Sequence, residues 1–313
     1  MKNKVIITGV AGFIGSNLAE RLLKSNAYKV VGIDNLTYGV KEQIPKGVEF
    51  HEMDIRSNRI YPLFKGVDFV FHLAAKNCIS DCQDNPIETS DINITGTVNI
   101  FEAAKRCGVK KVIYAESSAI YEDSTLFPTP ETENHPRSFY AISKACSSLF
   151  ASRYHFFFGL KTTGLRYFNV YGPRQDYRRT IPPVMSAFII RLLSGKPPII
   201  YGNGKKRRDF IYIDDVNDFH LLCLQNNSTD NEIFNIGSSK NYSILDIYNI
   251  ISSILKIKTP LVYKQDLPGE AQETLADITK AQKISWVPKT NIEVGLKNMI
   301  DYIKKEIALG NIK

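Results

Sequence analysis

Short apolar runs alternate with longer amphipathic stretches along the first two-thirds of the chain. Apolar runs lie at 5–8, 30–33, 67–73 and 111–115, and residues 161–166 also have the pattern of a strand. Such runs are typical of strands that are buried on both faces of a parallel sheet. Residues 13–25, 89–107 and 139–157, which lie between these runs, have the apolar spacing of helices. The alternation predicts an α/β fold with a doubly wound parallel sheet and right-handed crossovers.

The pattern changes after residue 169. Proline and glycine gather at 171–173, 182–183, 197–198 and 202–204, and the predicted elements become shorter. Helices are predicted at 216–224, 243–255 and 292–307, and strands at 233–236 and 261–263. We therefore predict a sheet domain at residues 1–168 and a smaller C-terminal α/β lobe at 169–313. This prediction allows the chain to pass between the two parts more than once.

Composition and charge narrow the class of protein. The 313 residues are 43% hydrophobic and 23% charged, which is ordinary for a globular protein and excludes long disorder. No apolar run reaches the roughly 18 residues of a membrane-spanning helix, and the N-terminus has no signal-peptide pattern. A soluble cytoplasmic protein without a membrane partner is expected. The net charge of +8 suits an anionic substrate or nucleic acid, but most Lys and Arg residues are dispersed.

The five cysteines are an odd number for a disulfide framework. Cys78 and Cys82 are four residues apart, but no second Cys or His pair completes a zinc site. We expect small buried thiols in a reducing compartment and no bound metal.

A glycine-rich segment joins the first predicted strand to the first predicted helix. Gly9, Gly12 and Gly15 suit a turn that needs a sharp bend, a close approach of a pyrophosphate and tight packing of helix on strand. Phe13 and Ile14 open the helix, whose first N–H groups favour phosphate. Taken alone, the spacing also fits a simple tight turn.

An acidic residue ends the second predicted strand. Asp34, followed by Asn35, lies nineteen residues after Gly15, where a carboxylate binds an adenosine ribose and repels a 2′-phosphate. Together with the glycines, Asp34 predicts NAD as the cofactor, although Asp34 alone also fits an Asx turn. Asp54 and Ile55 follow a third short strand, where they either edge the adenine or simply end that strand.

A tyrosine and a lysine provide the candidate chemistry. Tyr140 and Lys144 are four residues apart on a predicted helix, so the phenol and the ammonium share one face. A free phenol has a pKa near 10, whereas a cation within about 4–6 Å favours the phenolate. Ser117 and Ser118 follow a strand at the sheet edge where doubly wound folds bind ligands. The alternatives are a surface Tyr–Lys pair and serines that cap the next element.

Eight segments occur together in an order that belongs to a known family. They are residues 9–15, 34–35, 72–75, 93–97, 117–121, 140–144, 167–175 and 208–216. Over nearly its whole length the chain resembles the extended short-chain dehydrogenase/reductases, and in particular their NAD-dependent nucleotide-sugar epimerase branch. The resemblance implies a Rossmann-type NAD-binding domain and a C-terminal lobe that binds the sugar nucleotide.

The resemblance also implies roles for individual residues. Tyr140 is the base and acid, Lys144 holds the nicotinamide ribose and tunes Tyr140, and Ser117 contacts the sugar hydroxyl with Ser118 beside it. Asn169 would meet the diphosphate, and Arg208 would neutralise it. The remaining residues implied are Leu73, Ala74 and Ala75 for the cofactor, and Arg174, Val184, Tyr201 and Thr274 for the substrate. Lys205 and Lys206 are expected to be solvated.

The implied reaction is the 4-epimerisation of a UDP-sugar. Tyr140 removes the proton of the 4-hydroxyl while C4 gives hydride to NAD, and the hydride returns to the other face of a transient 4-keto sugar. A homodimer through the helices at 89–107 and 139–157 is implied as well, although their apolar faces also fit an ordinary core.

The chain departs from the family pattern at several positions. Glu116 stands where a small residue is usual, and Glu122 stands where glycine follows the tyrosine. Leu267 replaces an arginine that usually binds the diphosphate, and the cations expected to substitute for it are Arg174, Arg178 and Lys264. Thr274 replaces a bulky tyrosine that excludes N-acetylated sugars in some relatives, which favours UDP-N-acetylglucosamine over UDP-glucose.

Other activities are weighed against this one. Related 4,6-dehydratases carry an acidic pair directly after the catalytic serine or threonine, whereas this chain has Ser118 and Ala119. A dehydratase or another nucleotide-sugar oxidoreductase is therefore the second prediction. An NAD-sensing module without catalysis would not need Ser117, Tyr140 and Lys144 together. A nucleic-acid-binding protein would need a continuous basic face with interleaved aromatic residues.

Overall fold

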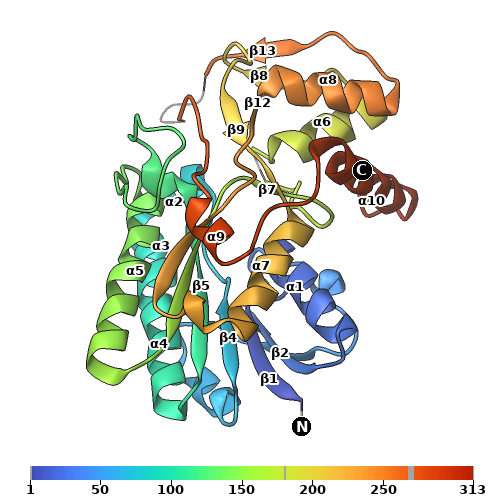
Figure 1. The fold of residues 1–313 in the computed structure, drawn as a ribbon. Coiled ribbons are helices and arrows are strands. Elements are labelled where there is room, and N and C mark those ends of the chain that lie inside the picture. The colour runs from blue at the N-terminus through green and yellow to red at the C-terminus, as the bar shows by residue number, and fades with distance from the viewer. Residues whose placement is uncertain (1, 180, 267–270, 313) are drawn as a thin grey trace. The chain divides into compact units, whose positions relative to one another are not determined.

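A parallel sheet of seven strands organises the fold of the computed structural model, which describes residues 2–179, 181–266 and 271–312 (Figure 1). The strand order is β11-β6-β5-β4-β1-β2-β3. The strands are β1 (Asn3–Thr8), β2 (Tyr28–Asp34), β3 (Glu49–Glu52), β4 (Phe69–His72), β5 (Lys111–Ser117), β6 (Thr162–Tyr167) and β11 (Glu232–Ile236). The predicted doubly wound parallel sheet is confirmed.

Helices cover both faces of this sheet because successive strand side chains point to opposite faces. On one face, where Figure 1 shows α4 (Gly96–Cys107) beside α5 (Phe139–Phe158), Tyr114 packs edge-on against Phe101 with ring centroids 5.6 Å apart. On the other face, Phe71 of β4 packs against His220 of α7 (Ile213–Gln225) at 5.3 Å. Helix α1 (Phe13–Lys24) connects β1 to β2.

The predicted helix at 89–107 is divided in the structure. A short α2 (Ile79–Asp84) leads to α3 (Pro86–Ser90), a π-helical turn follows at η3 (Asp91–Thr95), and α4 continues from it. Short 3₁₀ helices lie at η1 (Lys41–Gln43), η2 (Asn58–Phe64), η4 (Ser118–Tyr121) and η5 (Asn227–Thr229).

The chain forms two compact units that are not contiguous in sequence. The first unit comprises residues 1–125, 131–167 and 217–236, and the second comprises 126–130, 168–216 and 237–313. Residues 217–236 fall within the predicted C-terminal lobe, but they belong to the first unit because β11 pairs with β6. Residues 126–130 join the second unit, where Thr129 N donates to Leu275 O at 2.8 Å.

Among its described residues, the second unit combines helices with three two-stranded sheets. The sheets pair β7 (Val170–Tyr171) with β10 (Ile211–Tyr212), β9 (Arg207–Asp209) with β12 (Asn241–Ser243), and β8 (Ile199–Tyr201) with β13 (Val262–Lys264). The helices are α6 (Val184–Leu193), α8 (Ile244–Leu255), α9 (Thr279–Lys283) and α10 (Ile292–Ala308). The sequence did not predict α6, which begins directly after a proline pair. Its buried Phe188 packs edge-on against Tyr248 of α8 at 6.2 Å.

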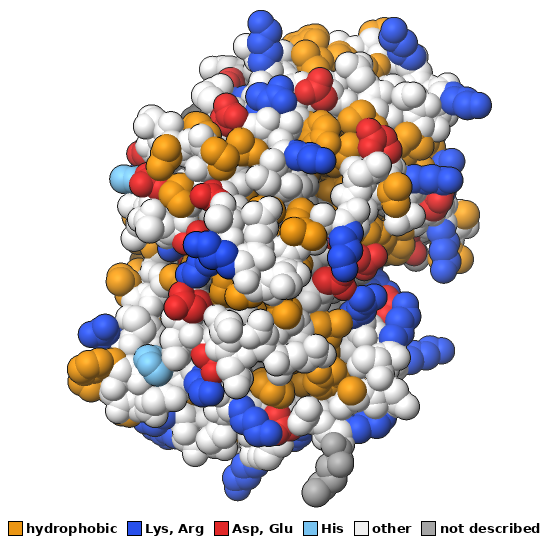
Figure 2. Space-filling model, viewed as in Figure 1, with side chains coloured by type: hydrophobic (Ala, Val, Ile, Leu, Met, Phe, Trp, Pro, Cys, Tyr) orange, Lys and Arg blue, Asp and Glu red, His pale blue; other side chains and the backbone are white. Residues whose placement is uncertain are grey.

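Two observations bear on partners. Among the described residues, no helix combines the length and the apolar character needed to cross a membrane. On the face that Figure 2 shows, Lys and Arg side chains are interspersed with acidic and apolar ones rather than joined in one basic patch.

Candidate active site

The glycines in the turn from β1 into α1 lie so close to neighbouring backbone atoms that a side chain would not fit there. Gly9 has φ +73°, and a Cβ there would lie 2.8 Å from Ala74 N. A Cβ on Gly15 would lie 2.2 Å from the carbonyl oxygen of Gly9. Gly12 caps α1 without a side-chain hydrogen bond, and the first turn of the helix has no acidic residue. The N–H groups of the first helical turn and the dipole at this helix end suit an anion such as a pyrophosphate.

Asp34 ties the end of β2 to this turn. Its Oδ2 accepts a hydrogen bond from Ala11 N at 3.0 Å, and its Oδ1 accepts one from Leu36 N at 2.9 Å. The second bond is the Asx turn that the sequence allowed. Burial raises the pKa of Asp34, while the two N–H donors oppose that shift. A carboxylate oxygen accepts more than one bond, so each oxygen still has a lone pair for a ribose hydroxyl.

The structure brings Asn35 and Asp54 together beside Asp34. Asn35 Nδ2 donates to Asp54 Oδ2 at 3.2 Å, and Arg56 donates to both oxygens of that carboxylate at 2.7 and 2.9 Å. The hydrogen bonds from Arg56 are the main cause that lowers the pKa of Asp54 to about 2. Ile55 is buried in the core, where a Cβ on Gly96 would meet its side chain at 2.6 Å. Its side chain is therefore committed to the core, and its carbonyl accepts a hydrogen bond from Asn99 Nδ2 at 2.6 Å.

A buried histidine joins the carboxyl ends of β1 and β4. Thr8 Oγ1 donates to His72 Nδ1 at 2.8 Å, and His72 Nε2 donates to Thr97 Oγ1 at 2.9 Å, because the Thr97 hydroxyl is itself committed to Asn93 O at 2.6 Å. Burial lowers the pKa of His72 to about 3, which keeps the ring neutral. Thr8 Oγ1 also accepts from the N–H groups of Leu73 and Ala74 at 3.2 and 3.3 Å. These two residues thus use their N–H groups within the protein.

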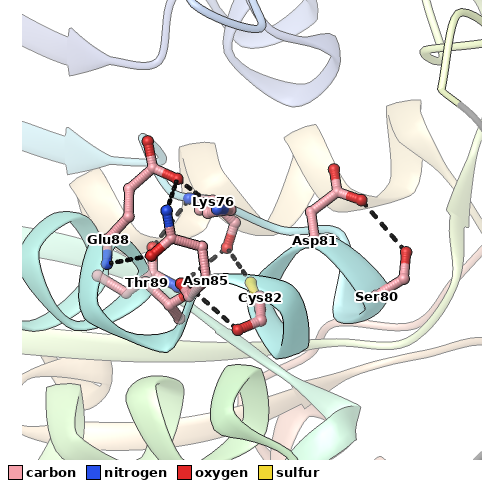
Figure 3. A network of polar contacts seen from close by, with 8 residues as sticks. Lys76, Ser80, Asp81, Cys82, Asn85, Glu88 and Thr89 are labelled. Atoms are coloured by element: carbon pink, nitrogen blue, oxygen red, sulfur yellow. Dashed lines mark hydrogen bonds and ion pairs between the residues drawn. The ribbon is translucent and has the colours of Figure 1, made fainter.

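The segment after Ala75 is held by a network that the sequence analysis missed. Asn93 accepts from Lys76 N at 2.8 Å and donates to Lys76 O at 2.9 Å and to Ser143 Oγ at 3.0 Å. Figure 3 shows the buried Lys76 side chain bonded to Glu88 and Glu88 bonded to Asn85. Asn93 thereby links the end of β4 to Ser143 of α5, the residue directly before Lys144. Its place in the recognised segment 93–97 was the available signal.

The start of α5 is fixed by Glu122, one of the departures from the family pattern. Glu122 Oε1 accepts from Ser138 Oγ at 2.7 Å, and Oε2 accepts from Ser138 N at 2.7 Å and Arg137 N at 3.0 Å. Ser138 in turn caps the helix by accepting from Ala141 N at 3.1 Å. The carboxylate therefore sets where the helix that carries Tyr140 begins.

Tyr140 and Lys144 lie one above the other along the first turns of α5. Tyr140 is half-buried, whereas Lys144 is buried and its Nζ donates to Ala115 O at 3.1 Å. Burial lowers the pKa of Lys144 to about 8. The ammonium thus lies at the carboxyl end of β5, at the carbonyl of Ala115, and Ser117 follows two residues later on the same strand.

Ser117 and Ser118 are half-buried at the end of β5. Ser117 Oγ accepts from Ala119 N at 3.2 Å and so caps η4, as one of the alternatives foresaw. Its hydroxyl hydrogen is still available for donation. Capping and contact with a substrate are therefore compatible.

The second unit gathers three of the predicted substrate residues. Asn169 Nδ2 donates to Asp209 O at 2.9 Å and lies 3.3 Å from Thr274 Oγ1. Thr274 Oγ1 accepts from Asp209 N at 3.1 Å, and Arg208 precedes Asp209 on β9. Asn169, Arg208 and Thr274 thus share one neighbourhood.

The other predicted substrate residues lie on different elements of the same unit. Val184 begins α6, Tyr201 ends β8, and Arg174 follows β7 with φ +70°. Leu267, the departure at the usual arginine position, lies outside the described residues.

The expectation that Lys206 is solvated is wrong. Its side chain is 5% exposed and is paired with Asp266. The alternation of a strand explains this, because β9 starts at the next residue and Lys206 points inward while Lys205 stays exposed.

Comparisons with known proteins identify the family of the chain. The model of the NAD dependent epimerase/dehydratase family matches residues 5–237. A UDP-glucuronate 4-epimerase of Thermodesulfobacterium geofontis is 35% identical over 97% of each chain.

Two solved structures are similar over nearly the whole chain. A UDP-glucose 4-epimerase of Thermotoga maritima with UDP-glucose has a TM-score of 0.94 and 35% identity, and covers 97% of this chain and 99% of its own. A UDP-N-acetylglucosamine 4-epimerase of Methanobrevibacter ruminantium in complex with UDP-N-acetylmuramic acid has a TM-score of 0.93 and 33% identity, and covers 98% of this chain and 100% of its own. The chain therefore belongs to the NAD-dependent epimerase/dehydratase family.

Proposed function

We propose that this protein is an NAD-dependent 4-epimerase of UDP-sugars. The observation that carries the proposal is the position of the Lys144 ammonium. It is buried one helical turn from Tyr140 and donates to the carbonyl of Ala115, which lies two residues before Ser117 at the carboxyl end of β5. All three groups lie in the unit that holds the glycine turn and Asp34. The relatives named above are 4-epimerases that act on three different UDP-sugars.

The residues around the glycine turn fit a dinucleotide. Gly9, Gly12, Phe13, Ile14 and Gly15 would hold the pyrophosphate, because this turn leads into the N-terminus of α1, whose N–H groups and dipole favour anions. The other residues that we assign to the cofactor are Asp34 and Asn35 at the ribose, Asp54 and Ile55 at the adenine, Leu73, Ala74 and Ala75, and Tyr140 with Lys144. When bound here, NAD would supply a reversible hydride acceptor for C4 of the sugar.

Tyr140 moves the proton. Its phenolate accepts the proton of the sugar 4-hydroxyl and the resulting phenol later returns it, and the Lys144 ammonium favours the phenolate form by its charge. Ser117 orients the sugar oxygen by donating a hydrogen bond, with Ser118 beside it. Because Ala119 supplies no acid, elimination of water from the 4-keto sugar lacks the group that a dehydratase needs.

The second unit would bind the nucleotide. We assign Asn169 and Arg208 to the diphosphate, because an arginine neutralises phosphate by charge-assisted bonds. Arg174, Val184, Tyr201 and Thr274 complete the assignment to the substrate. Thr274 is smaller than the tyrosine of some relatives, which supports UDP-N-acetylglucosamine as the preferred substrate.

We further propose a homodimer in the cytoplasm. The exposed face of α5 presents Ile142, Leu149 and Phe150, which are 42%, 65% and 40% exposed and follow helical spacing. An apolar stripe of this kind is suited to a second copy of the chain. All five cysteines are free thiols, which supports a reducing compartment.

The function is tested with purified protein and no added cofactor. We expect UDP-N-acetylglucosamine to give its C4 epimer without net NADH, and UDP-glucose to react more slowly. Tyr140→Phe should lower turnover by at least about a hundredfold, the usual contribution of acid–base catalysis, and still bind NAD. A 4-keto product that has lost water would identify a dehydratase instead. Full activity of Tyr140→Phe would refute the assignment of the base.

A further inference from the structure

Glu116 is a buried acid at the end of β5 that the reaction described above does not use. It lies between Ala115, whose carbonyl binds Lys144, and Ser117. Tyr114 faces α4, and Glu116 faces the same side because strand side chains repeat every two residues. The carboxylate is therefore directed to the face of the sheet that α5 covers.

An arginine on the next strand fixes one oxygen of this carboxylate. Glu116 and Arg166 are opposite each other in the register of β5 and β6, and Arg166 Nε donates to Glu116 Oε2 at 2.8 Å. The side chains are 0% and 5% exposed. Arg166 Nη1 also donates to the Tyr121 hydroxyl and to Glu131 O, both at 2.8 Å. Nε and Nη1 of the guanidinium are thus held by fixed partners, and this fixes the position of Glu116 Oε2.

The second oxygen of Glu116 is left without such a partner. Oε1 is buried and makes no hydrogen bond of ordinary geometry. The hydroxyls of Tyr114 and Ser148 approach the carboxylate, and Ser148 lies one turn after Lys144 on α5. Burial raises the pKa of Glu116, and the charges of Arg166 and Lys144 oppose this. Lys144 Nζ donates to the carbonyl of Ala115, the residue directly before Glu116, so the carboxylate and the ammonium lie at neighbouring positions at the end of β5.

The groups that act on Lys144 have opposite effects. His72 on β4 is neutral, and the thiol of Cys82 on α2 stays protonated because burial raises its pKa. Glu116 is the largest charge effect that favours the ammonium, whereas burial favours the neutral amine. Bound NAD would add a positive nicotinamide ring near Tyr140. The charge of Glu116 therefore favours the protonated form of Lys144.

We propose that Glu116 is a positioning residue of the reaction, which holds Lys144 as the ammonium at the Ala115 carbonyl and so keeps Tyr140 competent to move its proton. The proposal rests on the proposed function, because it assigns a role only if Tyr140 and Lys144 are catalytic. Glu116 touches neither substrate nor cofactor in this role and acts through Lys144.

The test compares Glu116→Gln with the unmodified protein in the epimerase assay across pH 6–10. Glutamine keeps the size and the acceptor for Arg166 but removes the charge. We expect the alkaline limb of kcat against pH to move to lower pH by about one unit, which is the effect of losing one nearby opposite charge. The KM for the UDP-sugar should change by less than about twofold. Glu116→Asp, which restores the charge, should return the limb toward its original pH.

Asp230→Asn is the matched control. Asp230 pairs with Lys111 at 2.5 Å, at the amino end of the same strand β5, so this change also removes a carboxylate from a largely buried ion pair. It should lower stability without moving the pH profile. If Glu116→Gln does not fold, Glu116→Gln combined with Arg166→Met removes both charges and should still show the shifted limb.

An unchanged alkaline limb in a folded Glu116→Gln variant with unmodified NAD content would overturn the proposal and leave the epimerase assignment intact. Absence of epimerisation by the unmodified protein would overturn the proposed function itself. A loss of stability alone, with the original pH profile, would show that Glu116 has only a structural role.

Discussion

Single buried side chains hold the ends of the central strands in place. His72 and His220 are buried, neutral rings on opposite sides of β4, and each bonds to hydroxyl or amide groups instead of charges. Burial lowers the pKa of both rings to about 3. Both rings therefore stay neutral in the folded protein at pH values where a histidine of the unfolded chain binds a proton, and the free energy of unfolding depends on pH for this reason.

The sign of that dependence follows from the unfolded chain, in which a histidine titrates near pH 6.5. Below that pH the unfolded state binds protons that the native rings refuse, so the free energy of unfolding falls as the pH falls. Each ring should cost about 2 kcal/mol between pH 7 and pH 5. The measurement is chemical denaturation at both pH values.

His72→Asn should be less stable at pH 7 but lose less stability at pH 5 than the unmodified protein. His135→Asn, at an exposed ring, is the control and should leave the difference unchanged. An equal loss in His72→Asn and the unmodified protein would contradict the explanation.

At the scale of elements, the sequence predicts what repeats locally and misses what depends on distant partners. β1, β2, β4, β5 and β6 were found because both of their faces are buried, so their apolar runs are continuous. Strands such as β7 and β9 have two or three residues and exist only through pairing with β10 and β12. No local pattern marks them.

The candidate site shows the same division. The glycine spacing and the Tyr140–Lys144 spacing are local and were read directly. The pairing of Glu116 with Arg166 joins residues fifty apart, and the bond of Asn93 to Ser143 does likewise. Both depend on strand order and helix packing, which fix the partners only after folding.

The element that most restricts substitution is the turn between β1 and α1. Gly15→Ala places a methyl group 2.2 Å from Gly9 O, so α1 must shift away from the strand. We expect a loss of about 1–3 kcal/mol from this overpacking and a loss of NAD binding, because the N–H groups of the helix move. Thermal denaturation and calorimetric titration with NAD measure the two effects.

Gly108→Ala is the comparison for this prediction. Gly108 ends α4 with φ +67°, and nothing lies within 4 Å of a Cβ there. The substitution should cost about 1 kcal/mol for the backbone conformation and leave NAD binding unchanged. Retained NAD binding in Gly15→Ala would show that this turn is not the cofactor site.

At the scale of the whole molecule, the proposed dimer predicts that charges placed on the exposed stripe of α5 reduce the molar mass in solution to that of a monomer. Leu149→Asp combined with Phe150→Asp puts two charges on the exposed stripe of α5, and a charge buried at an interface without a partner is costly. The variant should be monomeric in light scattering after size-exclusion chromatography. Val294→Asp, at a residue of α10 that is 52% exposed, should leave the dimer intact. A dimeric double variant would place the interface elsewhere.

The interleaving of the two units has a consequence for dissecting the gene. A fragment that stops after residue 168 lacks β11, so the backbone of β6 would present an unpaired edge to solvent. Open edges of this kind recruit other chains, and such a fragment should precipitate instead of serving as an isolated nucleotide-binding module. Insertion of a reporter or an affinity sequence is better directed to a surface turn such as Gly66, where a substituent meets no neighbour.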